Sequence, residues 1–317
     1  MCGTLHTCSK YLVVLTGATA SGKTDTAIRL ARHFKTEIIS ADSRQCYREL
    51  QIGVAAPTEA QLAAVPHHFI QSHSIHETVT AATFEQYALE RLHVLFASHD
   101  VVIVTGGTGL YIKALCSGLD TIPPADPKIR AAIQQGFAQE GILWLQQQLR
   151  EKDPLFAERG AMQNPQRMMR ALEVLQQTGV SILSLYTGSK MQRSFQCIFL
   201  GLDLPREVLY QRINQRVVHM MHNGLLEEAR ALYPYRHLNA LQTVGYQELF
   251  AYLDGTCTLD EAVAAIQMHT RRYAKRQGTW LRRQHSVQWF APDDDASMIT
   301  YIAAQMQQPN HNDSAAQ

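Results

Sequence analysis

The most constraining feature of this 317-residue sequence is the segment GATASGKT at positions 17–24. It fits the pattern G-x-x-x-x-G-K-[ST], follows a continuous apolar run at 11–15, and leads into a helical pattern at 23–34. In a strand–loop–helix unit of this kind, backbone N–H groups and the helix N-terminus surround phosphate oxygens. The segment therefore predicts a phosphate-binding loop. The alternative, a glycine turn of chance residues, leaves this context unexplained.

The whole loop is predicted to hold a diphosphate or triphosphate group. Lys23 adds a positive charge, and the hydroxyl of Thr24 can ligate Mg²⁺, which is the expected cofactor. The predicted diphosphate-binding residues are Gly17, Ala18, Thr19, Ala20, Ser21, Gly22, Lys23 and Thr24.

The carboxylate that usually completes a Mg²⁺ site in phosphate-loop NTPases is missing. The apolar run at 101–104 ends in Thr105-Gly106-Gly107, and the nearest acid, Asp100, precedes that run. This arrangement argues against ATP hydrolysis as the main chemistry and favours a loop that binds a departing pyrophosphate.

The order of apolar runs, glycine turns and helical patterns predicts the fold class. Strands are expected at 11–15, 37–40 and 101–105 with helices between them, which indicates a parallel α/β sheet. Strand signals vanish from about 123 to 194, where Gln, Glu, Arg and Leu recur at helical spacing. Within that stretch Asn164-Pro165 predicts a helix start.

The predicted architecture is a P-loop-type parallel sheet flanked by helices, with an all-helical insertion domain. A strand at 197–203, long helices to about 283 and a strand at 287–290 complete the core. The predicted parts are a first core segment at 1–122, the helical insertion at 123–194, a second core segment at 195–304 with basic helices, and a disordered tail at 305–317.

Composition excludes several classes of protein. With 46% hydrophobic and 18% charged residues the chain can bury a core, yet no apolar run approaches a membrane span. The six cysteines form no C-x-x-C pair, and the histidines at 67, 68, 73 and 76 match no metal-site spacing. A net charge of +1 means that any nucleic acid must bind a local patch. We expect a cytoplasmic monomer with no membrane partner.

Asp42 follows the second predicted strand and is a candidate catalytic residue. Ligands of open α/β sheets sit at the carboxyl ends of strands, so Asp42 shares an edge with the phosphate loop. A carboxylate there can hold Mg²⁺ or act as a general base, and Ser43 and Gln45 can hydrogen-bond a base edge. The alternative is a helix or turn cap.

The strongest signal for RNA in the sequence itself lies between 267 and 285. Six cations and no acid occur there, and Tyr273 and Trp280 interleave with them. Cations for phosphates and aromatic rings for stacking are typical of single-stranded loop recognition. The alternative is a solvated, charged helix face. The cations are Arg271, Arg272, Lys275, Arg276, Arg282 and Arg283.

Several segments together resemble the tRNA dimethylallyltransferases, the tRNA adenosine-37 isopentenyltransferase family. They are GATASGKT, DSRQCY, IGVAAP, GGTGLYIKAL, ADPKIR, NPQRMMRALEV, INQRVVHMMHNGLLEEA, TVGYQEL and AKRQGTWLR, in the family's order from about Val13 to Phe290. That family transfers a dimethylallyl group from dimethylallyl diphosphate to N6 of the adenosine beside the anticodon of tRNA. The resemblance implies that Asp42 takes the proton from the adenine amine.

The resemblance also implies that the insertion at 123–194 binds tRNA, and it implies further site residues. It implies that Thr24 and Arg216 are catalytic together with Asp42. Arg216 lies in line with an apolar helix stripe and would contact the diphosphate; the alternative is a snorkelling residue at the edge of that stripe. The implied contacts with the tRNA anticodon stem-loop are Asp42, Ser43, Arg44, Gln45, Thr108, Arg130, Gln166, Arg167, Met168, Met169, Arg170, Gln242, Thr243, Val244, Gly245, Tyr246, Gln247, Lys275, Arg276, Gln277, Trp280 and Arg282.

Two departures and two rival functions stay open. The family usually has Thr and Lys where this chain has Val54 and Ala56, which puts tRNA affinity or choice in doubt. A small-molecule kinase would need ATP turnover and a second Mg²⁺ carboxylate. An RNA-binding protein gated by a nucleotide would bind RNA without forming product, and would not need Asp42.

Overall fold

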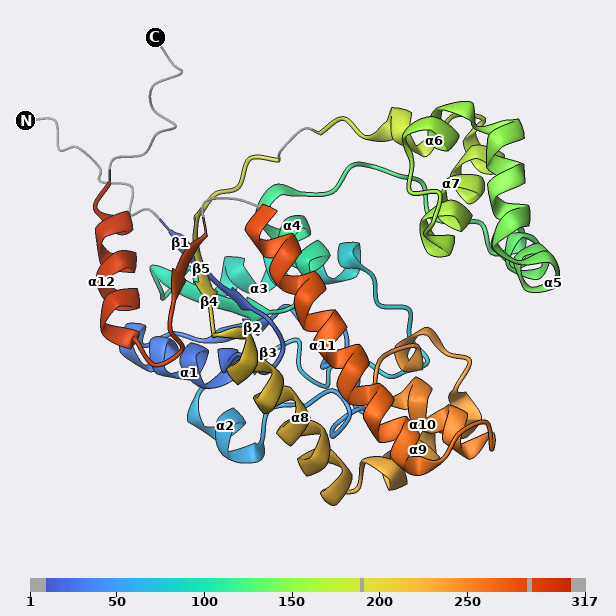
Figure 1. Ribbon diagram of the computed structural model, residues 1–317. Coiled ribbons are helices and arrows are strands. Elements are labelled where there is room, and N and C mark those ends of the chain that lie inside the picture. Colours follow the sequence, from blue (N-terminus) through green and yellow to red (C-terminus); the bar gives the residue numbers. More distant parts are fainter. Residues whose placement is uncertain (1–9, 189–190, 284–286, 309–317) are drawn as a thin grey trace, which may run out of the picture. The chain divides into compact units, whose positions relative to one another are not determined.

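A computed structural model describes residues 10–188, 191–283 and 287–308 of the chain (Figure 1). The described residues form two compact units. Gly118–Met191 make up one unit, and the chain before and after them makes up the other. The predicted insertion, 123–194, overlaps the first of these units, whose ends lie a few residues earlier.

The larger unit is built on a six-stranded parallel sheet with the strand order β3-β2-β4-β1-β5-β6. The predicted fold class is therefore confirmed. Of the described strands only β3 has no counterpart in the sequence analysis, because two histidines give no apolar run. The strands are β1 (Tyr11–Gly17), β2 (Ile38–Ser40), β3 (His67–His68), β4 (Val101–Gly106), β5 (Gln196–Leu202) and β6 (Gln288–Phe290).

Helices cover both faces of this sheet, as expected for parallel strands. Leu12 and Val14 of β1 face one core, and Val13 and Leu15 face the other. The first core is formed with α3 (Ala81–Leu95), α4 (Gly109–Ser117), α8 (Arg206–His222), α9 (Leu225–Leu232), α10 (Tyr246–Leu253) and α11 (Leu259–Arg283). The second is formed with α1 (Lys23–Phe34) and α12 (Asp295–Met306).

Short elements complete this unit, namely α2 (Glu59–Ala64) and the 3₁₀ helices η2 (Tyr233–Tyr235) and η3 (Asn239–Leu241). The sequence analysis did not predict α12, whose last residues, Gln305 and Met306, fall in the segment expected to be a tail. Residues 309–317 of that tail lie outside the described residues. No helix in the described chain is both long and apolar enough to cross a membrane.

The smaller unit is helical and contains α5 (Pro127–Lys152), α6 (Pro154–Arg159), α7 (Pro165–Thr178) and the 3₁₀ helix η1 (Ile182–Leu185). Each α-helix starts with proline, and the residue before it caps the helix: Asp126, Asp153 and Asn164 accept backbone N–H groups of the first turn. The predicted cap at Asn164 is confirmed, since its side chain accepts from the N–H of Arg167 at 3.1 Å.

Candidate active site

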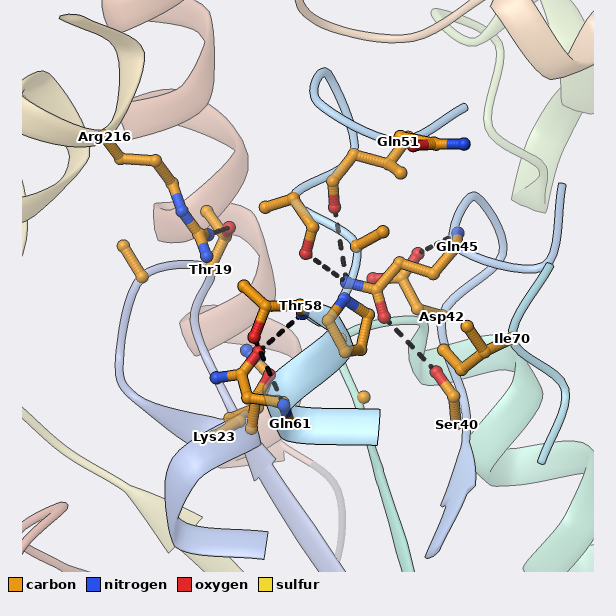
Figure 2. Close-up of a pocket in the computed structure, with 18 of the residues that line it drawn as sticks. Thr19, Lys23, Ser40, Asp42, Gln45, Gln51, Thr58, Gln61, Ile70 and Arg216 are labelled. Carbon is orange, nitrogen blue, oxygen red and sulfur yellow. Dashed lines mark hydrogen bonds between the residues drawn. The ribbon is translucent and has the colours of Figure 1, made fainter. Parts of the chain in front are cut away.

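A cavity of about 1000 Å³ lies at the carboxyl ends of β1, β2 and β4 (Figure 2). Parallel strands bring their carboxyl ends to one edge of the sheet, which is where ligands of such folds bind. Residues from the phosphate loop, from the end of β2, from α8 and from α11 line this cavity. Those predicted as site residues are Thr19, Ala20, Gly22, Lys23, Thr24, Asp42, Gln45, Arg216 and Gln277.

The phosphate loop presents Lys23 and the side chains of Thr19 and Thr24 to this space. Lys23 Nζ donates to the carbonyl oxygen of Ala18 at 2.7 Å, within the loop itself. Arg216 Nη1 on α8 donates to Thr19 Oγ1 at 3.2 Å. Ala18 and Ser21 line a second pocket of about 400 Å³, together with Trp289 of β6.

Two cations at this cavity have depressed pKa values. Burial, together with the nearby charge of Arg216, lowers the pKa of Lys23 to about 8, while Asp42 acts in the opposite direction. Burial also lowers the pKa of Arg216, offset in part by Asp42 and Asp25. Two desolvated positive groups side by side favour an anionic ligand between them.

Asp42 lines the same cavity and also caps a turn. Its Oδ1 accepts from the N–H groups of Arg44 and Gln45, at 2.9 and 3.3 Å. The cap considered as an alternative in the sequence analysis is therefore present for this oxygen. Within the described residues Oδ2 has no hydrogen-bond partner, so a second oxygen is available to a ligand.

The neighbours of Asp42 are hydrogen-bonded to three other segments of the chain. Ser43 N–H donates to Thr108 Oγ1 at 3.0 Å, and Thr108 Oγ1 donates to Ser43 Oγ at 3.2 Å. Arg44 Nη1 donates to the backbone of Asn239 at 2.9 Å, and Gln45 Nε2 to that of Ala55 at 2.9 Å. These predicted tRNA contacts thus hold the rim of the cavity together in the protein alone.

Tyr246, a predicted tRNA contact, is fully buried instead. Its hydroxyl donates to Glu228 Oε1 at 2.6 Å, and Glu228 also accepts the N–H groups of Ile52 and Gly53. A Cβ at Gly53 would lie 2.6 Å from the Tyr246 ring, so only glycine fits there. Tyr246 therefore supports the loop at 51–53 from below. Its neighbours Gln242 and Gln247 are exposed, and Thr243 and Val244 are half-buried, while Gly245 is buried.

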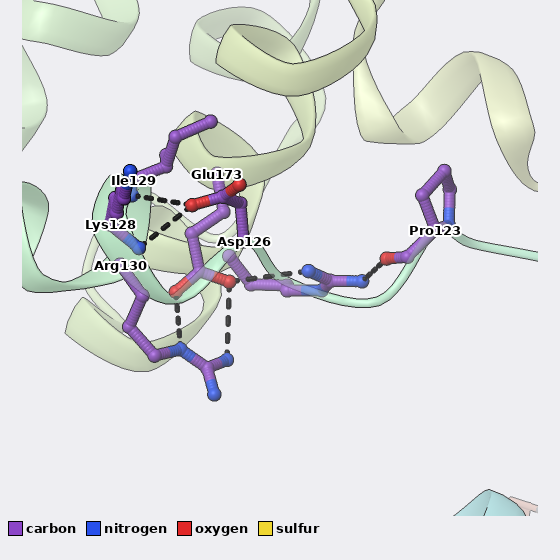
Figure 3. Close-up of polar contacts among 7 residues, drawn as sticks. Pro123, Asp126, Lys128, Ile129, Arg130 and Glu173 are labelled. Atoms are coloured by element: carbon purple, nitrogen blue, oxygen red, sulfur yellow. Dashed lines mark hydrogen bonds and ion pairs between the residues drawn. The ribbon is translucent and has the colours of Figure 1, made fainter.

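In the helical unit two of the three predicted arginines share one acid (Figure 3). Arg130 Nε and Arg170 Nη1 bond Glu173, at 2.8 and 3.2 Å, and the Glu173 side chain is only 4% exposed. Arg170 also donates to the carbonyl of Pro123. Met168 and Met169 are buried in the core of this unit in the protein alone, so their predicted contact with tRNA stays a prediction. Gln166 and Arg167 are exposed.

Helix α11 has an exposed basic face and a buried inner face. Lys275, Arg276 and Arg282 are exposed, and Arg282 pairs with Asp203 at 3.0 Å. Trp280 lies against Gly109, where an added Cβ would be 2.6 Å from its ring. Gln277 is only 8% exposed in the protein alone, and its predicted contact with tRNA stays a prediction. Residues 284–286, at the end of the predicted basic run, lie outside the described residues.

The sequence analysis missed a polar stripe along α8 and its C-cap, and it missed the place of one aromatic residue in the cavity. Arg212, His219 and Asn223 line the cavity at helical spacing with Arg216, a periodicity that could have identified them. Tyr273 was noted for its place among cations, but it lines this cavity as well. The apolar wall consists of Ile52, Val54, Leu62, Ile70 and Met220.

The structure gives no metal-binding cluster to the histidines. His67 Nδ1 bonds the carbonyl of Val65, and His68 Nε2 bonds Glu37. In the described part of the chain, no three His, Cys, Asp or Glu residues are grouped to hold a metal ion.

The fold and the cavity define an α/β protein with a phosphate loop and a carboxylate facing the same space. A family model described as IPP transferase matches residues 45–284. The chain is 47% identical over 291 residues to the tRNA dimethylallyltransferase of Christiangramia forsetii, covering 92% of this chain and 96% of that protein. The tRNA dimethylallyltransferase of Cytophaga hutchinsonii is 45% identical over 300 residues, 95% of this chain and 99% of that protein.

Solved structures agree with these relatives. The tRNA isopentenylpyrophosphate transferase of Bacillus halodurans matches with a TM-score of 0.69 and 34% identity, over 94% of this chain and 97% of that one. The chain belongs to the IPP transferase family. The family predicted from the sequence is therefore confirmed.

Proposed function

We propose that the protein transfers a dimethylallyl group from dimethylallyl diphosphate to N6 of adenosine-37, beside the anticodon of tRNA. The products are N6-(dimethylallyl)adenosine and pyrophosphate. The observation that carries this proposal is the common cavity, in which the phosphate loop, Arg216 and Asp42 face one another. Proteins 47% and 45% identical to this chain, named as tRNA dimethylallyltransferases, support it.

The reaction assigns a distinct task to each side of the cavity. The N6 amine attacks C1 of the dimethylallyl group, the C1–oxygen bond breaks, and the electron pair leaves with pyrophosphate. Asp42 accepts the proton that N6 loses, because an exocyclic adenine amine is a poor nucleophile until it sheds that proton. Lys23, Arg216 and the loop N–H groups stabilise the negative charge on the departing pyrophosphate.

The apolar wall suits the hydrocarbon part of the donor. Ile52, Val54, Ile70 and Met220 line the cavity together with the phosphate loop, so a short prenyl chain can lie against them while its diphosphate occupies the loop. An adenosine must leave its stack to reach Asp42, as in other enzymes that act on bases.

The residues present fit a Mg²⁺ ion that would be bound partly by the protein and partly by the substrate diphosphate. The Thr24 hydroxyl lines the cavity and has no hydrogen-bond partner within the described residues. With no cluster of three acidic, His or Cys side chains in the described chain, diphosphate oxygens and water would supply most ligands. Bound there, Mg²⁺ would neutralise charge on the diphosphate.

The partner is the anticodon stem-loop of tRNA, held by the exposed cations of α11 and by exposed residues of the helical unit. Lys275 and Arg276 have no ion-pair partner among the described residues, so their charges are available to phosphates. We place the protein in the cytoplasm as a monomer, where tRNA and the soluble donor are both at hand.

The test separates the base from the turn cap. Asp42→Asn keeps an oxygen for the N–H groups of Arg44 and Gln45 but cannot accept a proton, so we expect transfer to fall by about 10²–10⁴-fold. Asp42→Ala removes both roles and should abolish transfer, with tRNA still bound. The measurement is mass spectrometry of nucleosides from tRNA incubated with Mg²⁺ and dimethylallyl diphosphate.

The controls distinguish the rival functions. ATP in place of the prenyl donor should give neither modified adenosine nor ADP, whereas a kinase would form ADP. RNA binding without any modified nucleoside from the unmodified protein would favour a nucleotide-gated RNA-binding protein. A full-rate Asp42→Asn variant would refute the assigned base.

A further inference from the structure

Gln277 on α11 joins two loops that form the cavity. Its Oε1 accepts the N–H of Thr19 in the phosphate loop at 2.9 Å, and its Nε2 donates to the carbonyl oxygen of Gly107 at 3.0 Å. These partners lie 258 and 170 residues away along the chain. Because one is a donor and the other an acceptor, a single orientation of the amide satisfies both.

The approach to Gly107 is possible only because that residue is glycine. A Cβ at position 107 would lie 2.2 Å from Gln277 Nε2. With the side chain 8% exposed and both ends of its amide bonded, Gln277 has little left to offer an RNA base. A contact between glycine backbone and a buried amide is a structural clamp.

The turn at Gly107–Thr108 connects this clamp to Asp42, the proposed general base. Thr108 follows Gly107, and its hydroxyl accepts the N–H of Ser43, the residue after Asp42. The N–H of Thr108 donates to the carbonyl of Ala41 at 3.2 Å. The residues on both sides of Asp42 are thus fixed to the turn that Gln277 holds.

We propose that Gln277 is a positioning residue that sets the separation between the phosphate loop and Asp42. A continuous set of hydrogen bonds runs from Thr19 through Gln277 and the Gly107–Thr108 turn to Ser43. In transfer chemistry the acceptor nitrogen and the departing oxygen must stand in line with the carbon between them, so a shift of one loop against the other costs rate. This inference rests on the proposed function.

The same helix places Gln277 between two surfaces. Tyr273, four residues earlier, lines the cavity, and Trp280, three residues later, lies against Gly109. Lys275 and Arg276 point to the exposed side. RNA bound to the basic face would therefore contact the same helix, α11, that holds the phosphate loop through Gln277.

The test uses three substitutions of Gln277 and one neighbour. Gln277→Met keeps the length but removes both hydrogen bonds, and Gln277→Ala removes the side chain. We expect a 10–100-fold lower kcat, a 3–10-fold weaker affinity for inorganic pyrophosphate, and tRNA affinity within twofold of the unmodified protein. The measurements are steady-state kinetics, calorimetry and filter binding.

Gln277→Glu provides a readout that a merely structural role would not move. An ionised glutamate can accept from Thr19 but repels the carbonyl of Gly107, whereas a protonated one can donate to it. The rate of this variant, divided by that of the unmodified protein at each pH, should therefore rise as the pH falls. A flat ratio would contradict the clamp.

Thr279→Ala is the matched control, because that exposed hydroxyl bonds only the Lys275 carbonyl of its own helix. It should match the unmodified protein in every measurement. Gln277→Met with unchanged kcat and pyrophosphate affinity would overturn the proposal, and so would weaker tRNA binding at unchanged pyrophosphate affinity. Pyrophosphate binding needs no turnover, so failure of the proposed function would appear separately, as absence of modified adenosine from the unmodified protein.

Discussion

One charge cluster in each unit of the protein shows two opposite ways of treating charge. In the helical unit Arg130 and Arg170 share Glu173, an acid with a 4% exposed side chain. In the α/β unit Lys23 and Arg216 face a cavity, and the described residues include no acid in salt-bridge contact with either. A desolvated cation without a counter-ion is costly, so Lys23 and Arg216 favour binding of an anionic ligand. Arg130 and Arg170 already have an acid of the protein itself as their partner.

This comparison separates scaffold from site. A cation that is paired with an acid of the protein supports the fold. A desolvated cation without such an acid marks where an anionic ligand binds. Removing a charge from the cavity should therefore affect function, and removing the shared acid of the helical unit should affect stability.

The largest expected effect is on function, from Arg216→Ala. The substitution removes a group that faces the departing diphosphate, so we expect kcat/KM for dimethylallyl diphosphate to fall by about 10²–10³-fold. The stability of the protein should stay the same or rise, because an uncompensated cation leaves the interior. Transfer kinetics and chemical denaturation measure the two quantities. A stability loss with intact kinetics would reverse the comparison.

The next effect is on stability, from Glu173→Gln. Two arginines lose the charge that they share, so we expect the helical unit to lose about 1–3 kcal/mol in urea denaturation. Exposure of Arg130 limits the loss, since water can solvate its guanidinium. Pyrophosphate affinity of the α/β unit should not change, and a change there would show that the two units are not independent in this respect.

The sequence predicted those parts of the site that residues adjacent in the chain define. The loop at 17–24, the caps and the end of β2 at Asp42 are set by local patterns, because strand, turn and helix signals are short-range. The partners of Gln277 lie 170 and 258 residues away, and Glu173 lies 43 residues from Arg130, so no local pattern could distinguish these from surface residues.

Burial sets apart some of the predicted tRNA contacts in both units. Met168, Tyr246 and Gln277 belong to segments that resemble tRNA-binding segments of the family, yet all three side chains are buried. Segments that bind a ligand need residues beneath them to hold their shape, and sequence similarity alone does not separate the two groups.

The smallest expected effect is a pH dependence of donor binding, which tests directly whether the charge of Lys23 contributes to the affinity for the anionic donor. Burial lowers the pKa of Lys23 to about 8, so in the free protein this group is charged below pH 8 and neutral above it. An anionic donor favours the charged form and raises that pKa, so binding above pH 8 requires uptake of a proton and becomes weaker. Between pH 7 and pH 9 we expect affinity for dimethylallyl diphosphate to fall by up to about tenfold.

Calorimetry without tRNA measures that affinity, and the heat of binding in buffers of different ionisation enthalpy reports the proton taken up at pH 9. Lys23→Arg keeps a charge that does not titrate in this range, so its affinity should stay flat even if it is weaker overall. Arg130→Lys, in the helical unit, should leave the pH profile as it is, because its charge is already balanced by Glu173. An equally steep decline in Lys23→Arg would place the titrating group elsewhere, and the cavity would then hold its anion by hydrogen bonds and Arg216 rather than by the charge of Lys23.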